Sequence, residues 1–361
     1  MSEYVHLSIL NRTGTILLDR PKALNSLSLC MVRMIAATLQ AWRDDDGVDA
    51  VVIRSSSPKA FCAGGDIRFF HDAGRATPQG GSALLEDFFS EEYALNHLIH
   101  CYPKPYIALM DGVVMGGGMG VAQGGPQSRV RIVTDATKMA MPEVNIGLFP
   151  DVGGSYFLSR TPDYLGYYLG LTGQTMGAAD ALYAGLADHY VPQAEMGALL
   201  ALLEVTQGAQ LRTALAAFAA PFRAALAPSR LEAEHARIAR HFSAGSVPAI
   251  RASLAADPAP FAQQAVQAMD SRSPLMMSVT HELLQRGALL GVADCLRMER
   301  TLVRHNFEHG EVLEGVRALV IDKDNAPRWN PPTLDEVSAE MVARFFAPVW
   351  PPYAHPLRGL E

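Results

Sequence analysis

Two acidic residues, Glu143 and Asp151, lie close together in a segment of the chain that is otherwise mostly apolar. The segment covers residues 139–160, and a proline precedes each acid. Apolar neighbours would bury this segment, and paired carboxyl groups in a dry cleft suit acid/base or nucleophilic chemistry on a carbonyl carbon. Either acid alone could instead cap a helix or form an ion pair. The pairing, with a Gly-Gly pair after the second acid, favours the catalytic interpretation.

Two glycine stretches offer a second chemical function. Residues 60–66 read AFCAGGD and residues 115–120 read MGGGMG, and each follows a predicted strand and leads into a predicted helix. Exposed backbone N–H groups at such a point attract a developing negative oxygen, so both stretches could converge on one carbonyl oxygen. For residues 63–66, a tight turn in which Asp66 caps the helix is an equally good interpretation. The glycine spacing excludes a dinucleotide fingerprint, and the chain has no Gly-Lys dipeptide for a P-loop.

Other candidate sites are weaker. Ser155 does not fit a serine-hydrolase elbow, because Phe157 stands where that motif needs glycine. His305 and His309 have the spacing of metal ligands on a helix, with Glu308 between them, but no further ligand stands out. We therefore interpret these three residues as a solvated helix face and predict no metal.

The composition narrows the class of protein. The chain has 361 residues, of which 49% are apolar and 19% charged, and its formal net charge is −7. This charge argues against nucleic-acid binding, and no uninterrupted apolar run is long enough to predict a membrane span. The widely spaced cysteines suggest reduced core thiols, and the first twenty residues look like a hairpin rather than a targeting peptide. We expect a cytoplasmic protein.

The order of predicted elements is typical of an α/β fold. A hairpin of residues 4–11 and 15–19 precedes a helix capped by Ser28 and then a buried strand over 50–54. Further strands are expected over 106–110, 129–134 and 138–141, and helices over 84–101, 178–184 and most of 193–310. We also expect a mobile lid-like loop over 71–82 and a strand-like segment over 316–324.

Three of these stretches resemble the crotonase, or enoyl-CoA hydratase/isomerase, superfamily, and within it the 3-hydroxyisobutyryl-CoA hydrolases. They are residues 60–68, 105–120 and 141–160, and the likeness extends to residues 87–96 and 314–324 and so to the whole chain. The resemblance implies an α/β, crotonase-like spiral of repeated ββα units with a helical C-terminal region. Residues 1–200 would form the spiral core with the CoA-thioester site, and residues 201–361 a mostly helical region packed on it.

The resemblance also implies a site. The backbone N–H groups of Gly65 and Gly117 would form an oxyanion hole for the thioester carbonyl, with Glu143 as the principal catalytic acid and Asp151 as its partner. Glu92 would contact the substrate. Further substrate-binding positions are expected near the adenine end of coenzyme A and beside the glycines, namely Lys22, Ala23, Leu24, Ala63 and Asp66.

The implied reaction is hydrolysis of a short branched 3-hydroxyacyl-CoA thioester, with 3-hydroxyisobutyryl-CoA of valine degradation as the expected substrate. Hydratases of the superfamily carry a glutamate where this chain has Gly120 and a glycine where it has Asp151. Glu143 would act as nucleophile or as base on water, and Asp151 would orient water or the substrate hydroxyl. No cofactor is expected, since coenzyme A enters as part of the substrate, and a homo-oligomer remains open. An enoyl-CoA hydratase/isomerase and a non-catalytic CoA-thioester-binding protein are the alternatives.

Overall fold

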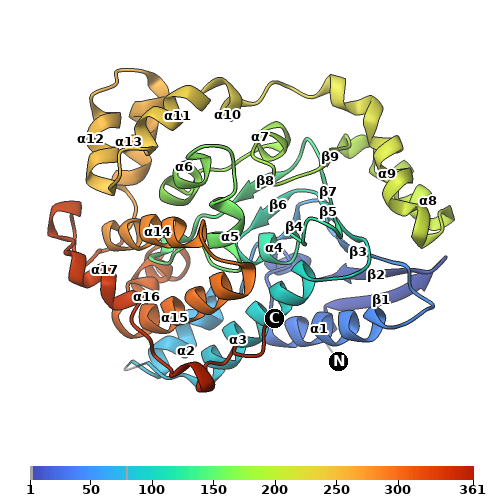
Figure 1. Cartoon of the computed structure of the whole chain (residues 1–361), viewed down its shortest axis with the longest axis horizontal. Coiled ribbons are helices and arrows are strands. Elements are labelled where there is room, and N and C mark those ends of the chain that lie inside the picture. Colours follow the sequence, from blue (N-terminus) through green and yellow to red (C-terminus); the bar gives the residue numbers. More distant parts are fainter. Residues whose placement is uncertain (1–2, 79) are drawn as a thin grey trace. The chain divides into compact units, whose positions relative to one another are not determined.

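The chain divides into two compact units, each assembled from three separate segments. The computed structural model describes residues 3–78 and 80–361 (Figure 1). The first unit contains the residues up to Gly65 together with Leu95–Ala140 and Met176–Ala233, and the second contains Asp66–Ala94, Met141–Thr175 and Glu234–Glu361. The predicted division of the chain at residue 200 stays a prediction.

The first unit contains two β-sheets. In the larger sheet the strand order is β1-β2-β3-β5-β7-β9, and only the β1-β2 hairpin is antiparallel. The smaller sheet is parallel, with the order β4-β6-β8. The strands are β1 (Val5–Leu10), β2 (Thr13–Leu18), β3 (Ala50–Ser55), β4 (Ala60–Cys62), β5 (Tyr106–Met110), β6 (Val113–Met115), β7 (Arg129–Val133), β8 (Lys138–Ala140) and β9 (His189–Tyr190).

Alternate residues of the central strands build the core of the first unit. Val52 of β3, Ile107 of β5 and Ile132 of β7 are at most 1% exposed, and they belong to one apolar cluster with helices from later in the chain. Leu199 and Leu215 come from those helices, which cover this face of the sheet. Side chains at every second position of a strand share a face, so the short apolar runs predicted as strands form one continuous layer.

The helices of the first unit include the one predicted after Ser28. The Ser28 side chain accepts a hydrogen bond from the Met31 N–H, which confirms Ser28 as its N-cap. These helices are α1 (Leu29–Arg43), α4 (Gly117–Gly120), α7 (Ala178–Tyr183), α8 (Met196–Val205), α9 (Leu211–Ala219) and α10 (Arg230–Ala233). Helix α3 (Ala83–His100) contributes residues to both units.

The second unit is helical. Besides the first part of α3 it contains α2 (Ile67–Ala76), α5 (Gly154–Leu158), α6 (Leu165–Thr172), α11 (His235–Phe242), α12 (Val247–Ala255), α13 (Pro260–Asp270), α14 (Pro274–Gly287), α15 (Val292–His309), α16 (Val312–Val316) and α17 (Ala339–Phe345). The predicted helix-rich region of residues 193–310 is confirmed. Among the described residues, no helix has both the length and the apolar character needed to cross a membrane.

The predicted loop over residues 71–82 is wrong for its first half. Helix α2 begins after Asp66, whose side chain accepts a hydrogen bond from the Phe69 N–H, and it continues to Ala76. Gly74, which suggested a loop, lies on a packed face, since a Cβ there would come within 2.6 Å of the Leu313 side chain. The glycine therefore permits close packing rather than marking a turn. Gln79 lies outside the described residues.

The strand-like interpretation of residues 316–324 is also wrong. The chain continues from α16 into a π-helical turn, Arg317–Ile321. Arg317 forms ion pairs with Glu314, Asp322 and Asp324. The helical turn places these carboxylates around one guanidinium, and the apolar run of the sequence does not predict this pairing.

Asn25 ties three parts of the first unit together. Its side-chain amide donates to the Ser55 hydroxyl at 2.7 Å and to the carbonyl groups of Ala60 and Phe61 at 3.2 and 3.1 Å. The side-chain oxygen accepts the Arg20 N–H at 2.7 Å, and the residue is fully buried. Asn25 thus fixes the turn after β2 against β4, the strand that leads to Gly65.

We expect Asn25→Ala to lower the free energy of unfolding by about 2 to 3 kcal/mol, because the substitution leaves several buried polar groups without partners. Chemical denaturation followed by circular dichroism measures this change. Gln40→Ala, at an exposed position of α1, is the control and should alter stability by less than about 0.5 kcal/mol. Equal stabilities of the two variants would contradict the role given to Asn25.

Candidate active site

Glu143 is a buried acid with an unused oxygen in the second unit. It opens a short 3-10 turn, Glu143–Ile146, that follows Pro142 and ends at Gly147 with a positive φ of 69°. The residue is 6% exposed, and its Oε2 atom has no hydrogen-bond partner among the described residues. Buried polar atoms are nearly always paired, so an unpaired carboxyl oxygen marks a position where a ligand or water is expected.

Asp151 lies in the same unit, in the turn before α5. It is 5% exposed, and the hydroxyl group of Tyr93 donates to its Oδ2 atom at 2.6 Å. Tyr93 itself is fully buried on α3. This hydrogen bond fixes the direction of the Asp151 carboxyl group and stabilises its ionised form.

Glu92, which precedes Tyr93 on α3, is the third buried acid. It is 2% exposed, and no described residue pairs with its Oε1 atom. Glu92 therefore resembles Glu143 in having a carboxyl oxygen left for another molecule. Its neighbour Glu91, by contrast, is only partly buried.

The acids disfavour one another's ionisation. Burial and then the charge of Asp151 raise the pKa of both Glu92 and Glu143 well above the ordinary value. Burial raises the pKa of Asp151 to about 6, although the Tyr93 hydrogen bond opposes the rise. Asp151 is therefore the first of these carboxyl groups to lose its proton as the pH rises, and the others retain theirs longer. Carboxyl groups with separated pKa values are the arrangement that acid/base catalysis uses.

Glu299 is a fourth buried acid, and no motif in the sequence predicts it. It lies on α15, is fully buried, and accepts hydrogen bonds from the N–H groups of Gly153 and Ser155 at 2.8 and 2.9 Å. Burial raises its pKa to about 8. The only signal in the sequence was an acid within an otherwise amphipathic helix, and most such acids are solvated. The Ser155 hydroxyl, considered above as a nucleophile, also donates to Glu299.

The two glycine stretches meet in the first unit. A Cβ added to Gly64 would lie 3.3 Å from the backbone nitrogen of Gly117, and one added to Gly118 would lie 2.2 Å from the Cys62 carbonyl oxygen. Only glycines allow this approach. No carbonyl or side chain of the described residues accepts a hydrogen bond from the N–H of Gly65 or Gly117. The oxyanion-hole assignment to these two N–H groups stays a prediction.

The positions expected near the adenine end are also neighbours in the first unit. Lys22 and Ala23 belong to a short 3-10 turn, Pro21–Ala23, and the Leu24 carbonyl accepts the Ala63 N–H at 3.0 Å. Leu24 is 41% exposed. Asp66 belongs to the second unit, where it caps α2 as described, and its role toward substrate stays a prediction.

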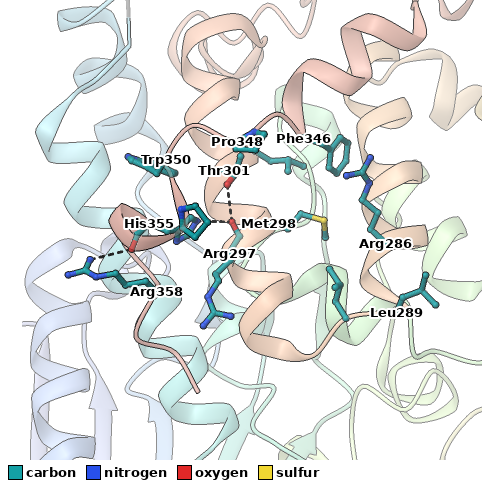
Figure 2. Close-up of a pocket in the computed structure, with 13 residues that line it drawn as sticks. Arg286, Leu289, Arg297, Met298, Thr301, Phe346, Pro348, Trp350, His355 and Arg358 are labelled. Atoms are coloured by element: carbon teal, nitrogen blue, oxygen red, sulfur yellow. Dashed lines mark hydrogen bonds between the residues drawn. The ribbon is translucent and has the colours of Figure 1, made fainter.

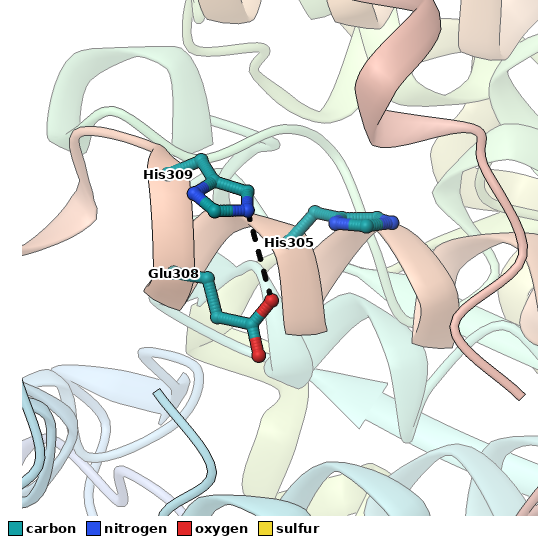
Figure 3. A group of neighbouring side chains, drawn as sticks. All are labelled: His305, Glu308 and His309. Carbon is teal, nitrogen blue, oxygen red and sulfur yellow. Dashed lines mark ion pairs between the residues drawn. The ribbon is translucent and has the colours of Figure 1, made fainter. Parts of the chain in front are cut away.

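The His305, Glu308 and His309 group on α15 has a structural explanation (Figure 3). Glu308 accepts a hydrogen bond from the Arg304 Nε at 2.6 Å, and His309 Nε2 lies 3.9 Å from the other oxygen of Glu308. His305 Nε2 lies 2.9 Å from the Ala347 carbonyl oxygen. The adjacent guanidinium group neutralises Glu308 and would repel a metal cation, so we assign no metal site here.

A pocket of about 720 Å³ in the second unit is separate from the acids (Figure 2). Its walls include Phe346 and Trp350, and three arginines line it. Arg286 pairs with Glu282 and lies over the Phe346 ring, and Arg297 donates to carbonyl groups of the C-terminal segment. These contacts show that two of the arginines bind the protein's own chain, so we assign this pocket no ligand.

Comparison with known proteins agrees with the fold and the sequence motifs. The sequence profile of the enoyl-CoA hydratase/isomerase family matches residues 13–346. The chain is 40% identical over 337 residues to the mitochondrial 3-hydroxyisobutyryl-CoA hydrolase of Xenopus tropicalis, covering 92% of this chain and 86% of the relative. It is 37% identical over 338 residues to the corresponding protein of Homo sapiens, with the same coverage. The chain belongs to the enoyl-CoA hydratase/isomerase, or crotonase, family.

Solved structures confirm the predicted α/β, crotonase-type fold. A carnitinyl-CoA dehydratase from Mycobacterium thermoresistibile is 39% identical and superposes with a TM-score of 0.88, covering 97% of this chain and 98% of its own. An enoyl-CoA hydratase from Rhodobacter sphaeroides 2.4.1 is 39% identical, with a TM-score of 0.85 and coverage of 96% and 98%. Proteins named for different reactions thus share this architecture over their whole length.

The raised pKa of Asp151 predicts a stability change that does not depend on any assay of function. The pKa of Asp151 is about 6 in the folded protein, against an ordinary value of 3.8. Ionised Asp151 therefore lowers the free energy of unfolding fully above the folded pKa, and the effect disappears below the ordinary value. We expect Asp151→Asn to stabilise the protein by about 2 to 3 kcal/mol at pH 7.5 and by less than about 1 kcal/mol at pH 4.

Denaturation curves at both pH values measure this difference. Asp335→Asn, at an exposed position, is the matched control and should show no such pH dependence. An Asp151→Asn protein whose stability gain is equal at the two pH values would contradict the burial of an ionisable Asp151.

Proposed function

We propose that this protein hydrolyses a short branched 3-hydroxyacyl-CoA thioester, and that the substrate is 3-hydroxyisobutyryl-CoA, cleaved to 3-hydroxyisobutyrate and coenzyme A. The observation that carries the proposal is the pair of buried acids, Glu143 and Asp151, with a free oxygen on Glu143 and a hydrogen-bonded carboxyl group on Asp151. The names of the curated relatives at 37 to 40% identity support the same reaction. This reaction would place the protein in valine degradation.

The acids differ in a way that suits thioester cleavage. Asp151 has the lower pKa and is ionised near neutral pH. Its carboxylate can therefore orient a water molecule or the substrate hydroxyl by accepting a hydrogen bond from it. Glu143, with the higher pKa, is the stronger base once ionised, and when protonated it can return a proton to the departing CoA sulfur. Glu143 either attacks the acyl carbon itself or activates water for the attack, and both routes use its unpaired oxygen.

The remaining predicted residues complete the proposal. The N–H groups of Gly65 and Gly117 would stabilise the oxyanion that forms when the acyl carbon is attacked, a contribution of about 10²- to 10³-fold in rate for each donor. The unpaired Oε1 of Glu92 would accept a hydrogen bond from the substrate. Lys22, Ala23, Leu24 and Ala63 would contact the adenine end of coenzyme A, and Asp66 is retained as a substrate-binding position.

A hydratase or dehydratase is the second candidate function. Two solved structures at 39% identity carry such names. Adding water across a double bond uses two carboxylates on that water, and Gly120 stands where the family's hydratases have the second one. Asp151 supplies a carboxylate at a different place, which favours hydrolysis.

The cellular location and the assembly of the protein do not follow from the proposed reaction. The sequence predicts a cytoplasmic protein, whereas the curated vertebrate relatives are named as mitochondrial. A homo-oligomer stays a prediction from the sequence, and size-exclusion chromatography with light scattering would measure the oligomeric state.

The proposed reaction is tested by thiol release. Purified protein should release coenzyme A from 3-hydroxyisobutyryl-CoA faster than from a panel of linear acyl-CoA esters, and should hydrate crotonyl-CoA weakly or not at all. Glu143→Gln should lower thiol release by about 10²- to 10⁴-fold while binding of the CoA ester persists. Glu340→Gln, at an exposed position, is the control and should retain full activity. Efficient hydration without thiol release would establish the second candidate instead.

The Tyr93 hydrogen bond predicts the pH dependence of the reaction. It lowers the pKa of Asp151, so Tyr93→Phe should raise that pKa above about 6 and shift the acid limb of kcat/KM to higher pH. Tyr353→Phe, at a position that is 81% exposed, should leave the profile unchanged. An acid limb that stays in place in Tyr93→Phe would show that ionisation of Asp151 does not limit the rate.

A further inference from the structure

The turn that carries Asp151 is strained. Val152 has a positive φ of 53°, a conformation that β-branched residues rarely adopt, and Gly153 follows with a φ of 89°. Val152 is only 3% exposed, so its side chain is packed and cannot relax into solvent. Strained backbone of this kind persists only where surrounding groups enforce it, and it often occurs at functional sites.

Glu299 is the group that binds this turn. One carboxyl oxygen accepts the Gly153 N–H at 2.8 Å, and the other accepts both the Ser155 N–H at 2.9 Å and the Ser155 hydroxyl. Two of these donors are backbone N–H groups, which cannot act as acceptors. The carboxyl group of Glu299 therefore fixes two backbone positions, Gly153 and Ser155, directly after Val152.

Stability alone does not account for an acid at this position. Glu299 is fully buried, and among residues 3–78 and 80–361 no cation forms an ion pair with it. Burying an ionised carboxyl group costs free energy, and its hydrogen bonds offset only part of this cost. The pKa of Glu299 is raised because burial disfavours its ionised form more than the hydrogen bonds favour it. A group retained at such a cost, next to a strained turn, suggests a requirement for defined geometry.

We propose that Glu299 is a positioning residue for Asp151: by binding the N–H groups of Gly153 and Ser155 it holds the strained turn that presents the Asp151 carboxyl group to the substrate. This inference rests on the proposed thioester hydrolysis and adds a residue to its machinery. Asp151 is then fixed twice, through its side chain by Tyr93 on α3 and through its backbone turn by Glu299 on α15.

The test is Glu299→Gln. The amide oxygen can accept from the N–H of either Gly153 or Ser155, but the NH₂ group then faces the other N–H donor and one hydrogen bond is lost. We expect kcat for thiol release to fall by about 10²-fold with KM within about threefold, because the substrate still binds while the acid is displaced. Glu282→Gln, at a surface ion pair, is the matched control and should leave kcat and KM unchanged. An unchanged kcat in Glu299→Gln, or a loss that lies entirely in KM, would overturn the proposal.

A strain-relief variant separates positioning from general stability. Glycine adopts a positive φ without strain, so adding Val152→Gly to Glu299→Gln should recover about tenfold in kcat. Should Glu299→Gln fail to fold, the double variant is expected to fold and to show activity above background. A double variant that neither folds nor regains activity overturns the proposal. Failure of the proposed function is a distinct result, since it would appear as absence of thiol release by the unaltered protein.

Discussion

Burial of carboxyl groups without a compensating cation is the constraint around which the second unit is built. Glu92, Glu143, Asp151 and Glu299 are each at most 6% exposed, and in the described part of the chain no lysine, arginine or histidine forms an ion pair with any of them. An isolated ionised carboxylate in such surroundings is unfavourable, so the acids keep protons that solvated acids would lose. The hydrogen bonds from Tyr93 and from the turn before α5 determine where a negative charge is most easily carried.

Unusual backbone geometry occurs beside predicted site residues in each of the two units. Glu143 begins a 3-10 turn closed by Gly147, and Asp151 precedes a turn with two consecutive positive φ angles. In the first unit, Gly64 and Gly118 lie where no side chain would fit. Each feature costs conformational stability, and each lies beside a residue predicted to act on the substrate. Local rules of foldability are commonly broken at such sites and compensated elsewhere.

The comparisons illustrate how much a shared fold leaves undecided. Proteins named as hydrolase, hydratase and dehydratase align with this chain at similar identity. A shared fold does not by itself decide the reaction, which depends on the side chains that it carries at the site. In this chain Gly120 and Asp151 are the two positions on which the proposed distinction between hydrolysis and hydration rests. Changing these two residues alters little of the sequence, but it would change which reaction the proposed site can catalyse.

The sequence by itself determined the elements with strong local signals and the residues with strong motifs. The hairpin, the helix capped by Ser28, the central strands and the acids at 143 and 151 were predicted because alternation, capping chemistry and flanking prolines act over a few residues. Tertiary structure decided the rest. Gly74 is helical where it packs against Leu313, far along the chain, and Tyr93 and Glu299 reach the Asp151 turn only after folding. Such contacts join residues far apart in the chain, and no local pattern records them.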